Sequence, residues 1–264
     1  MKSVRPAAVA GTFYPAAPQM LRQAVRDYLA QSSTSSPKPP KAIIAPHAGF
    51  VYSGPIAASV YGLLQNAPDK IRKVILLGPS HRVPLLGLAA SSAEYFSTPL
   101  GTIPLDRDNI EQLLALPQVT ILDEAHAMEH SLEVQLPFLQ TVLDDFSLTP
   151  LVVGDASPDE ISEALETVWG GDETLIVISS DLSHYHDYQT AKIMDQATSD
   201  AIENLQAEKL RYDDACGRSP IKGLLTIAKR KGFKARTIDL RNSGDTAGDK
   251  NQVVGYGAYA FYEQ

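Results

Sequence analysis

Three histidines of this sequence each follow a run of apolar residues that is typical of a strand buried on both faces of a sheet. Because the carboxyl ends of parallel strands meet at one rim, where open α/β sheets bind their ligands, we predict that the three imidazoles share one site. Pro46 supports a strand end before the first of them, since proline cannot donate to a β-ladder. The histidines and the apolar runs that they follow are His47 after residues 42–45, His81 after residues 73–78 and His184 after residues 174–179.

Imidazoles gathered in this way are typical ligands of transition metals. Two imidazoles and one carboxylate form the facial triad of non-haem Fe(II) enzymes, which leaves positions open for substrate and oxygen. Zinc accepts similar ligands, with water as the nucleophile. Asp181 lies shortly before His184. Its carboxylate could orient an imidazole or simply cap the segment after the strand.

Four further residues have both a functional and a structural interpretation. Glu129 lies at a predicted helix start, where the helix dipole stabilises an acidic side chain, but that explanation does not extend to His130. Cys216 is expected to be a buried small residue rather than a nucleophile. Tyr14 is expected to pack as an aromatic residue, although an N-terminal segment folded across the rim could deliver its hydroxyl to a ligand. We therefore place His130 and Tyr14 at the substrate.

The elements that would position these residues alternate along the chain. Pro137 lies inside one helical pattern, so we expect a kink or a late start there. The alternation predicts a three-layer α/β/α sandwich around a mostly parallel sheet, in a single domain over residues 1–264. Helices are predicted over residues 19–31, 55–65, 105–116, 131–146, 190–204 and 221–231. Strands are predicted over residues 42–45, 73–78, 85–90, 119–122, 151–154, 174–179, 234–240 and 253–262.

Composition excludes several classes of protein. The chain has 264 residues, and its 23 basic and 31 acidic side chains give a net charge of −8, which argues against nucleic acid as a partner. A single cysteine rules out an internal disulfide framework and a multi-cysteine zinc site. No apolar run is long enough to span a membrane, and the first residues do not resemble a signal peptide. We expect a soluble, cytoplasmic protein.

Six motifs occur in order over nearly the whole chain. They lie at residues 9–15 (VAGTFYP), 45–54 (APHAGFVYSG), 78–81 (GPSH), 129–133 (EHSLE), 179–184 (SSDLSH) and 242–245 (NSGD). Together they resemble the Memo family, which includes the AmmeMemoRadiSam system protein B group. This resemblance implies the fold of the class III extradiol dioxygenases, with a cleft at one end of the central sheet.

The resemblance also implies roles for individual residues. In class III extradiol dioxygenases two histidines and a glutamate hold Fe(II), and another histidine acts as acid and base near the substrate. By motif, His47 and His81 match the metal ligands, and His184 matches the acid/base residue. Fe(II) is therefore the cofactor that the resemblance favours, with zinc or copper as alternatives.

The third metal ligand is where this chain departs from the family pattern. Animal members carry a cysteine near the last strand, and counting back from Tyr256 puts that position at Thr246, a poor ligand. Asp245 or Asp249 could substitute for it, and we take Asp245 as the expected ligand and Thr246 as a residue at the substrate.

Three hypotheses follow. The first is a metal-dependent oxidoreductase that uses Fe(II). The second, motivated by Thr246, is a non-catalytic module that binds a peptide or small anion in the same cleft. The third is a zinc-dependent hydrolase. The sequence predicts neither the substrate nor the oligomeric state.

Overall fold

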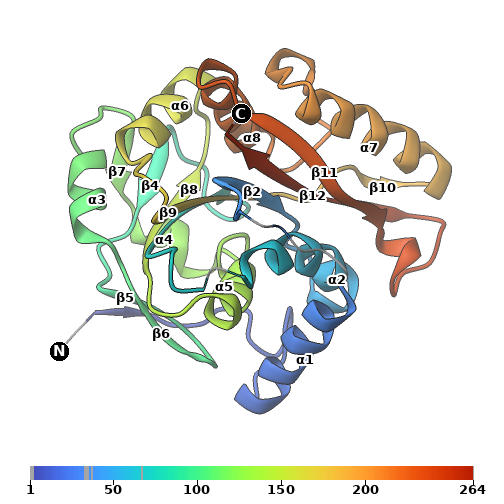
Figure 1. The fold of residues 1–264 in the computed structure, drawn as a ribbon, viewed down its shortest axis with the longest axis horizontal. Coiled ribbons are helices and arrows are strands. Elements are labelled where there is room, and N and C mark those ends of the chain that lie inside the picture. The colour runs from blue at the N-terminus through green and yellow to red at the C-terminus, as the bar shows by residue number, and fades with distance from the viewer. Residues whose placement is uncertain (1–2, 33–35, 37, 67, 264) are drawn as a thin grey trace.

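The fold is built on one large sheet, seen in the computed structural model for residues 3–32, 36, 38–66 and 68–263. Its strands are β2 (Ala42–Ala45), β3 (Lys73–Pro79), β4 (Leu88–Ala90), β7 (Val119–Ile121), β8 (Ser147–Val153), β9 (Thr174–Ser179), β10 (His184–His186), β11 (Lys234–Asn242) and β12 (Val253–Tyr262). Within the described residues they form a nine-stranded sheet in the order β10-β12-β2-β9-β3-β8-β4-β7, with β11 paired to β12 (Figure 1).

The centre of this sheet is parallel. β2, β9, β3 and β8 are neighbours that run in the same direction, whereas β12 pairs antiparallel with β2, and β4 pairs antiparallel with β8. Every residue of β2 and β9 is buried, as expected for strands covered on both faces. Burying one Ile or Val side chain of this kind stabilises the fold by about 1.5–3 kcal/mol. The predicted sandwich around a mostly parallel sheet is confirmed.

Helices cover the sheet on both sides. They are α1 (Pro18–Gln31), α2 (Phe50–Tyr61), α3 (Arg107–Leu113), α4 (Asp123–Ala127), α5 (Leu136–Val142), α6 (Pro158–Thr167), α7 (Tyr188–Glu203) and α8 (Arg218–Arg230). α2 packs on β2 and β12, and α8 packs on β3 and β9. Figure 1 shows α1, α2 and α5 on one side of the sheet and α6, α7 and α8 on the other.

Two predicted helices differ from the structure because of proline. The helix expected over residues 131–146 is shorter in the structure: a 3₁₀ turn at Glu133–Gln135 leads into α5, and Pro137 lies in the first turn of that helix. Proline needs no partner there for its missing N–H, so it marks a late start rather than a kink. α2 begins at Phe50, earlier than predicted, and carries Pro55 inside it.

A small second sheet was not predicted from the sequence. It consists of β1 (Val4–Arg5), β5 (Tyr95–Thr98) and β6 (Gly101–Pro104) in the order β1-β5-β6. These strands have at most four residues, too few for a clear alternating pattern. The small sheet attaches the N-terminal segment to the body of the fold.

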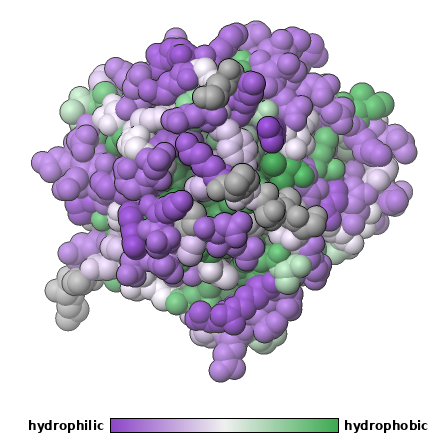
Figure 2. Space-filling view, viewed as in Figure 1, coloured by the Kyte–Doolittle hydropathy of each residue, from purple (hydrophilic) through white to green (hydrophobic). Residues whose placement is uncertain are grey.

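The surface is polar over most of the face seen in Figure 2, where apolar side chains form scattered patches. Among the described residues, no helix is both long and apolar enough to cross a bilayer.

Candidate metal centre

A cleft of about 820 Å³ opens at the carboxyl ends of β2, β9 and β3. The parallel order of these strands explains why residues distant in sequence meet here, because each strand releases its following loop at the same rim. The cleft lining includes His47, His81, His130, His184, Asp181 and Arg82, together with Phe13, Tyr52, Tyr185, Asp249 and Tyr256. The prediction that His47, His81 and His184 gather in one place is confirmed.

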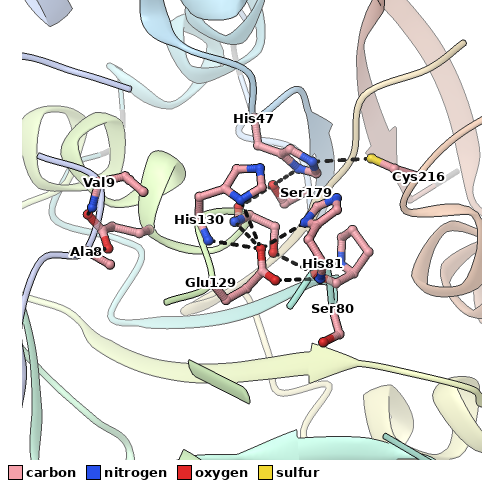
Figure 3. A network of polar contacts seen from close by, with 12 residues as sticks. Ala8, Val9, His47, Ser80, His81, Glu129, His130, Ser179 and Cys216 are labelled. Carbon is pink, nitrogen blue, oxygen red and sulfur yellow. Dashed lines mark hydrogen bonds and ion pairs between the residues drawn. The ribbon is translucent and has the colours of Figure 1, made fainter. Parts of the chain in front are cut away.

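Three side chains come close enough to hold one metal ion. One ligand atom from each of His47, His81 and Cys216 lies within 4.8 Å of the other two. The Cys216 Sγ is 3.3 Å from His47 Nε2. The rings of His47 and His81 have centroids 5.2 Å apart and an interplanar angle of 78°. Figure 3 shows these residues converging from separate segments of the chain.

His47 is held by the turn between β2 and α2. Its backbone N–H donates to Asp181 Oδ1 at 2.7 Å, and its Nδ1 lies 2.9 Å from Ser179 Oγ. Burial, together with the neighbouring His81, His130 and His184, keeps the pKa of His47 well below its ordinary value. This imidazole is therefore neutral at physiological pH, as a metal ligand must be.

Asp181 acts on the backbone rather than on a ring. Its carboxylate accepts the His47 N–H, so it fixes the strand end and does not orient an imidazole. Burial raises the pKa of Asp181 to about 6, although hydrogen bonds from the backbone oppose this shift. The carboxyl group still lines the cleft, within reach of a bound ligand.

His81 is oriented by the buried carboxylate of Glu129. Glu129 Oε1 lies 2.9 Å from His81 Nδ1, and Oε2 accepts the His81 backbone N–H at 2.6 Å. Oε1 also accepts the backbone N–H groups of His130 and Ser131, each at 2.9 Å. Burial alone would raise the pKa of Glu129, but the bonds from His81 and the backbone lower it to about 2. An ionised carboxylate on Nδ1 leaves the Nε2 lone pair of His81 for a metal.

His130 and His184 complete the imidazole cluster. The His130 ring stacks on His81 with centroids 4.6 Å apart and contacts Phe13 at 4.6 Å. Burial and the neighbouring His81 lower the pKa of His130 to about 4. Its buried Nδ1 makes no hydrogen bond and lies 3.3 Å from Glu129 Oε1. His184 Nδ1 lies 2.8 Å from the Leu182 carbonyl, which can only accept, so its Nε2 is free to take a proton.

Cys216 precedes α8 and carries a protonated thiol. Burial raises the pKa of Cys216 to about 12, and the nearby Asp181 adds to this shift. The Asp181 backbone N–H donates to Sγ at 3.3 Å. A metal ion at this position would displace the thiol proton and bind the thiolate. Two imidazoles and one thiolate suit Fe(II), copper and zinc, whereas magnesium and calcium prefer oxygen ligands.

Three of the predicted site residues lie elsewhere. Asp245 Oδ1 accepts from the Tyr188 hydroxyl at 2.6 Å, and its side chain lines a different hollow beside α7. Thr246 donates to the Ser243 carbonyl at 3.2 Å and is absent from the cleft lining. Tyr14 is buried and donates to Glu133 Oε1 at 2.5 Å, so its hydroxyl anchors the N-terminal segment. Asp249, the other aspartate considered, does line the cleft.

Sequence reasoning missed two residues of the site. Glu129 was expected at a helix start, but no helix begins there, and its carboxylate holds His81. Cys216 was expected to be inert. The adjacent histidine was the available signal for Glu129, whereas Cys216 lies 169 positions from His47 and had no local signal.

Comparison with known proteins identifies relatives over almost the whole chain. The family model of Memo-like proteins matches residues 5–260. A MEMO1 family protein of Aquifex aeolicus is 38% identical over 264 residues, covering 96% of this chain and 97% of the relative. One from Sulfolobus acidocaldarius is 35% identical over 283 residues, with coverage of 96% and 97%.

A solved structure shares the fold. The crystal structure of the uncharacterized protein JW3007 from Escherichia coli K12 matches with a TM-score of 0.53, covering 81% of this chain and 98% of that one. The sequence identity is 13%, so this likeness supports the α/β sandwich and carries nothing about activity.

Proposed function

Because the chain belongs to the family of Memo-like proteins, we propose that its histidine cleft binds a transition metal and uses it in redox chemistry on a small ligand. One observation carries this proposal. The ligand atoms of His47, His81 and Cys216 lie within 4.8 Å of one another, close enough to bind one ion. In this proposal Cys216 is the third ligand, instead of the Asp245 expected from the sequence. Each of the three side chains is held in place by a neighbouring group. Ser179 contacts the His47 ring, Glu129 contacts the His81 ring, and Cys216 lies just before the start of α8.

Fe(II) is the metal that we propose. His47, His81 and Cys216 would hold the ion and would leave coordination positions for a substrate and for oxygen, and iron would supply redox chemistry there. His184 lines the same cleft with a free Nε2, so we assign it the role of general acid and base. His130 and Asp181 line the cleft beside it and would contact the substrate.

Arg82 suggests the charge of that substrate. Its guanidinium is exposed at the cleft, directly after the ligand His81. No ion pair with a carboxylate is found for it within the described residues. A free guanidinium beside a metal centre is suited to hold an anionic group such as a carboxylate. We therefore propose a small anionic ligand.

The metal proposal is tested by loading and spectroscopy. Metal-free protein without a histidine tag is incubated anaerobically with Fe(II), and the bound metal is counted after desalting. We expect about one equivalent, and less than about a tenth of an equivalent would overturn the proposal. Cobalt(II) then reports the ligand set, since a thiolate ligand gives a charge-transfer band in the near ultraviolet. Cys216→Ser should abolish that band, and His47→Ala should abolish binding.

The matched control is His186→Ala, which removes an imidazole close in sequence to His184 but outside the cleft lining. This variant should bind the metal as the wild type does. Equal loss of metal in His186→Ala and His47→Ala would mean that the metal sits at adventitious surface histidines.

Zinc hydrolysis is the second candidate, because the same nitrogen and sulfur donors are common zinc ligands with an open position for water. Metal competition decides between the two. Oxygen consumption that requires iron and is lost on zinc replacement favours the oxidoreductase, whereas activity on esters or amides with zinc favours the hydrolase.

A further inference from the structure

We propose that Ser179 is a positioning residue that forces the proton of His47 onto Nδ1 and so presents the Nε2 lone pair to the metal. This inference rests on the proposed function only for the role of Nε2, because the proton position itself is a property of the metal-free protein. It follows from counting donors and acceptors in a buried network of Ser179, Gln135, Tyr61 and Ser131.

The orientation of the Gln135 amide is determined from two sides. Its Nε2 lies 2.9 Å from the Pro46 carbonyl, which can only accept a hydrogen bond. Its Oε1 lies 2.9 Å from the Tyr61 hydroxyl. The nitrogen therefore also faces Ser179 Oγ, at 2.7 Å, and donates to it. One lone pair of the Ser179 hydroxyl is occupied by this bond.

The Ser179 hydroxyl has a single proton, and it donates that proton to the Ser131 carbonyl. Ser179 Oγ lies 2.6 Å from the Ser131 carbonyl, an acceptor only. If the hydroxyl turned its proton toward His47 instead, the buried Ser131 carbonyl would lose this bond. Ser179 therefore donates to Ser131 and accepts from Gln135, and only a second lone pair is left for His47.

The remaining contact then fixes the tautomer of His47. Its Nδ1 lies 2.9 Å from Ser179 Oγ, which can only accept at this point, so Nδ1 carries the proton. The opposite nitrogen, Nε2, is free of hydrogen and faces Cys216 Sγ at 3.3 Å. Ser179 and Gln135 have no exposed surface, and His47 is 1% exposed, so the network is sheltered from solvent that could rearrange it.

Nitrogen NMR on the full, metal-free chain tests this directly. Two-bond ¹H–¹⁵N correlations of the imidazole rings show which nitrogen is protonated, and the His47 signals are assigned by their loss in His47→Gln. We expect the Nδ1–H form in the wild type. An Nε2–H form there would overturn the proposal without any variant.

Ser179→Ala removes the acceptor, so we expect the His47 proton to move to Nε2. We also expect affinity for cobalt(II) to fall by roughly 10-fold to 100-fold, the usual effect of losing a group that orients a metal ligand. Ser179→Thr keeps the hydroxyl and should restore the Nδ1–H form. Ser162→Ala, which removes another buried hydroxyl from α6, should leave the tautomer unchanged.

The outcomes separate the two proposals. An unchanged tautomer in Ser179→Ala overturns the positioning role, whether or not the protein binds metal. The expected tautomers in a protein that binds no metal would uphold the positioning role and reject the metal site.

Discussion

Replacing Glu129 by glutamine tests whether this carboxylate, which accepts more than one hydrogen bond from His81, orients that metal ligand. The carboxylate accepts four hydrogen bonds: two from His81, one from His130 and one from Ser131. Three of them reach Oε1, so the glutamine oxygen would occupy that position. Its NH₂ group would then face the His81 backbone N–H, and two donors cannot bond each other.

The magnitude follows from this geometry. One hydrogen bond to a charged group is lost and one partly buried N–H is left unpaired, which costs about 1.5–3 kcal/mol of stability. His81 also loses the negative charge that strengthens it as a ligand. Loss of such a partner lowers metal affinity about 10-fold to 100-fold, or about 1.4–2.8 kcal/mol.

The pH dependence of stability provides a second signature of the same residue. Because the native structure lowers the pKa of Glu129 from 4.5 to about 2, its ionised form stabilises the fold above pH 4.5. That stabilisation is lost as the pH falls toward 2. Glutamine cannot titrate, so Glu129→Gln should remove this part of the acid sensitivity.

Denaturant unfolding between pH 2 and pH 7 and competition with a metal-binding dye measure both effects. Glu111→Gln, which removes an exposed carboxylate from α3, is the control and should change neither. Wild-type metal affinity in a folded Glu129→Gln variant would refute the claim that this carboxylate orients His81.

Three further changes probe the ligand set and the cleft. Metal affinity should rise about tenfold per pH unit in the wild type, because binding displaces the Cys216 proton, and this slope should vanish in Cys216→Ser when measured by dye competition. Arg82→Gln should weaken benzoate binding to the metal-free protein by roughly tenfold in calorimetry, with Arg107→Gln as control, and an unchanged affinity would reject the anion site. Asp245→Asn should leave metal affinity unchanged in the same dye assay, since its carboxylate bonds Tyr188, and a large loss would restore it as a ligand.

Much of the fold could be predicted because its signals are local. β9 contains an unbroken apolar run at residues 175–178, and α6 begins with a capping box at Ser157 and Glu160. The shared rim followed from strand direction, which placed His47 and His81 together. The late start at Pro137 was one of the two outcomes expected, but the bounds of α5 could not be predicted, since the apolar spacing continues through residues that the structure leaves outside the helix.

The third ligand could not be found from local signals. Counting back along the last strand led to Asp245 and Thr246, but that count fixes only a sequence position and not where the side chain points. Cys216 reaches His47 because Gly217, the residue before α8, packs directly against Ser180 at the end of β9, where a Cβ would lie 2.6 Å from that side chain. Close packing of this kind depends on the assembled tertiary structure.

The electrostatics of the cleft favour a cation at its centre and an anion at its edge. Glu129 is ionised at neutral pH, whereas His47 and His130 have lowered pKa values and carry no charge. The Cys216 thiol, with its pKa raised to about 12, is also uncharged until a cation displaces its proton. A divalent ion that binds the thiolate therefore adds only one net positive charge, beside a carboxylate that is already ionised. An anion at the same point would meet that carboxylate and several nitrogen lone pairs, so the place for an anionic group is the rim, at Arg82.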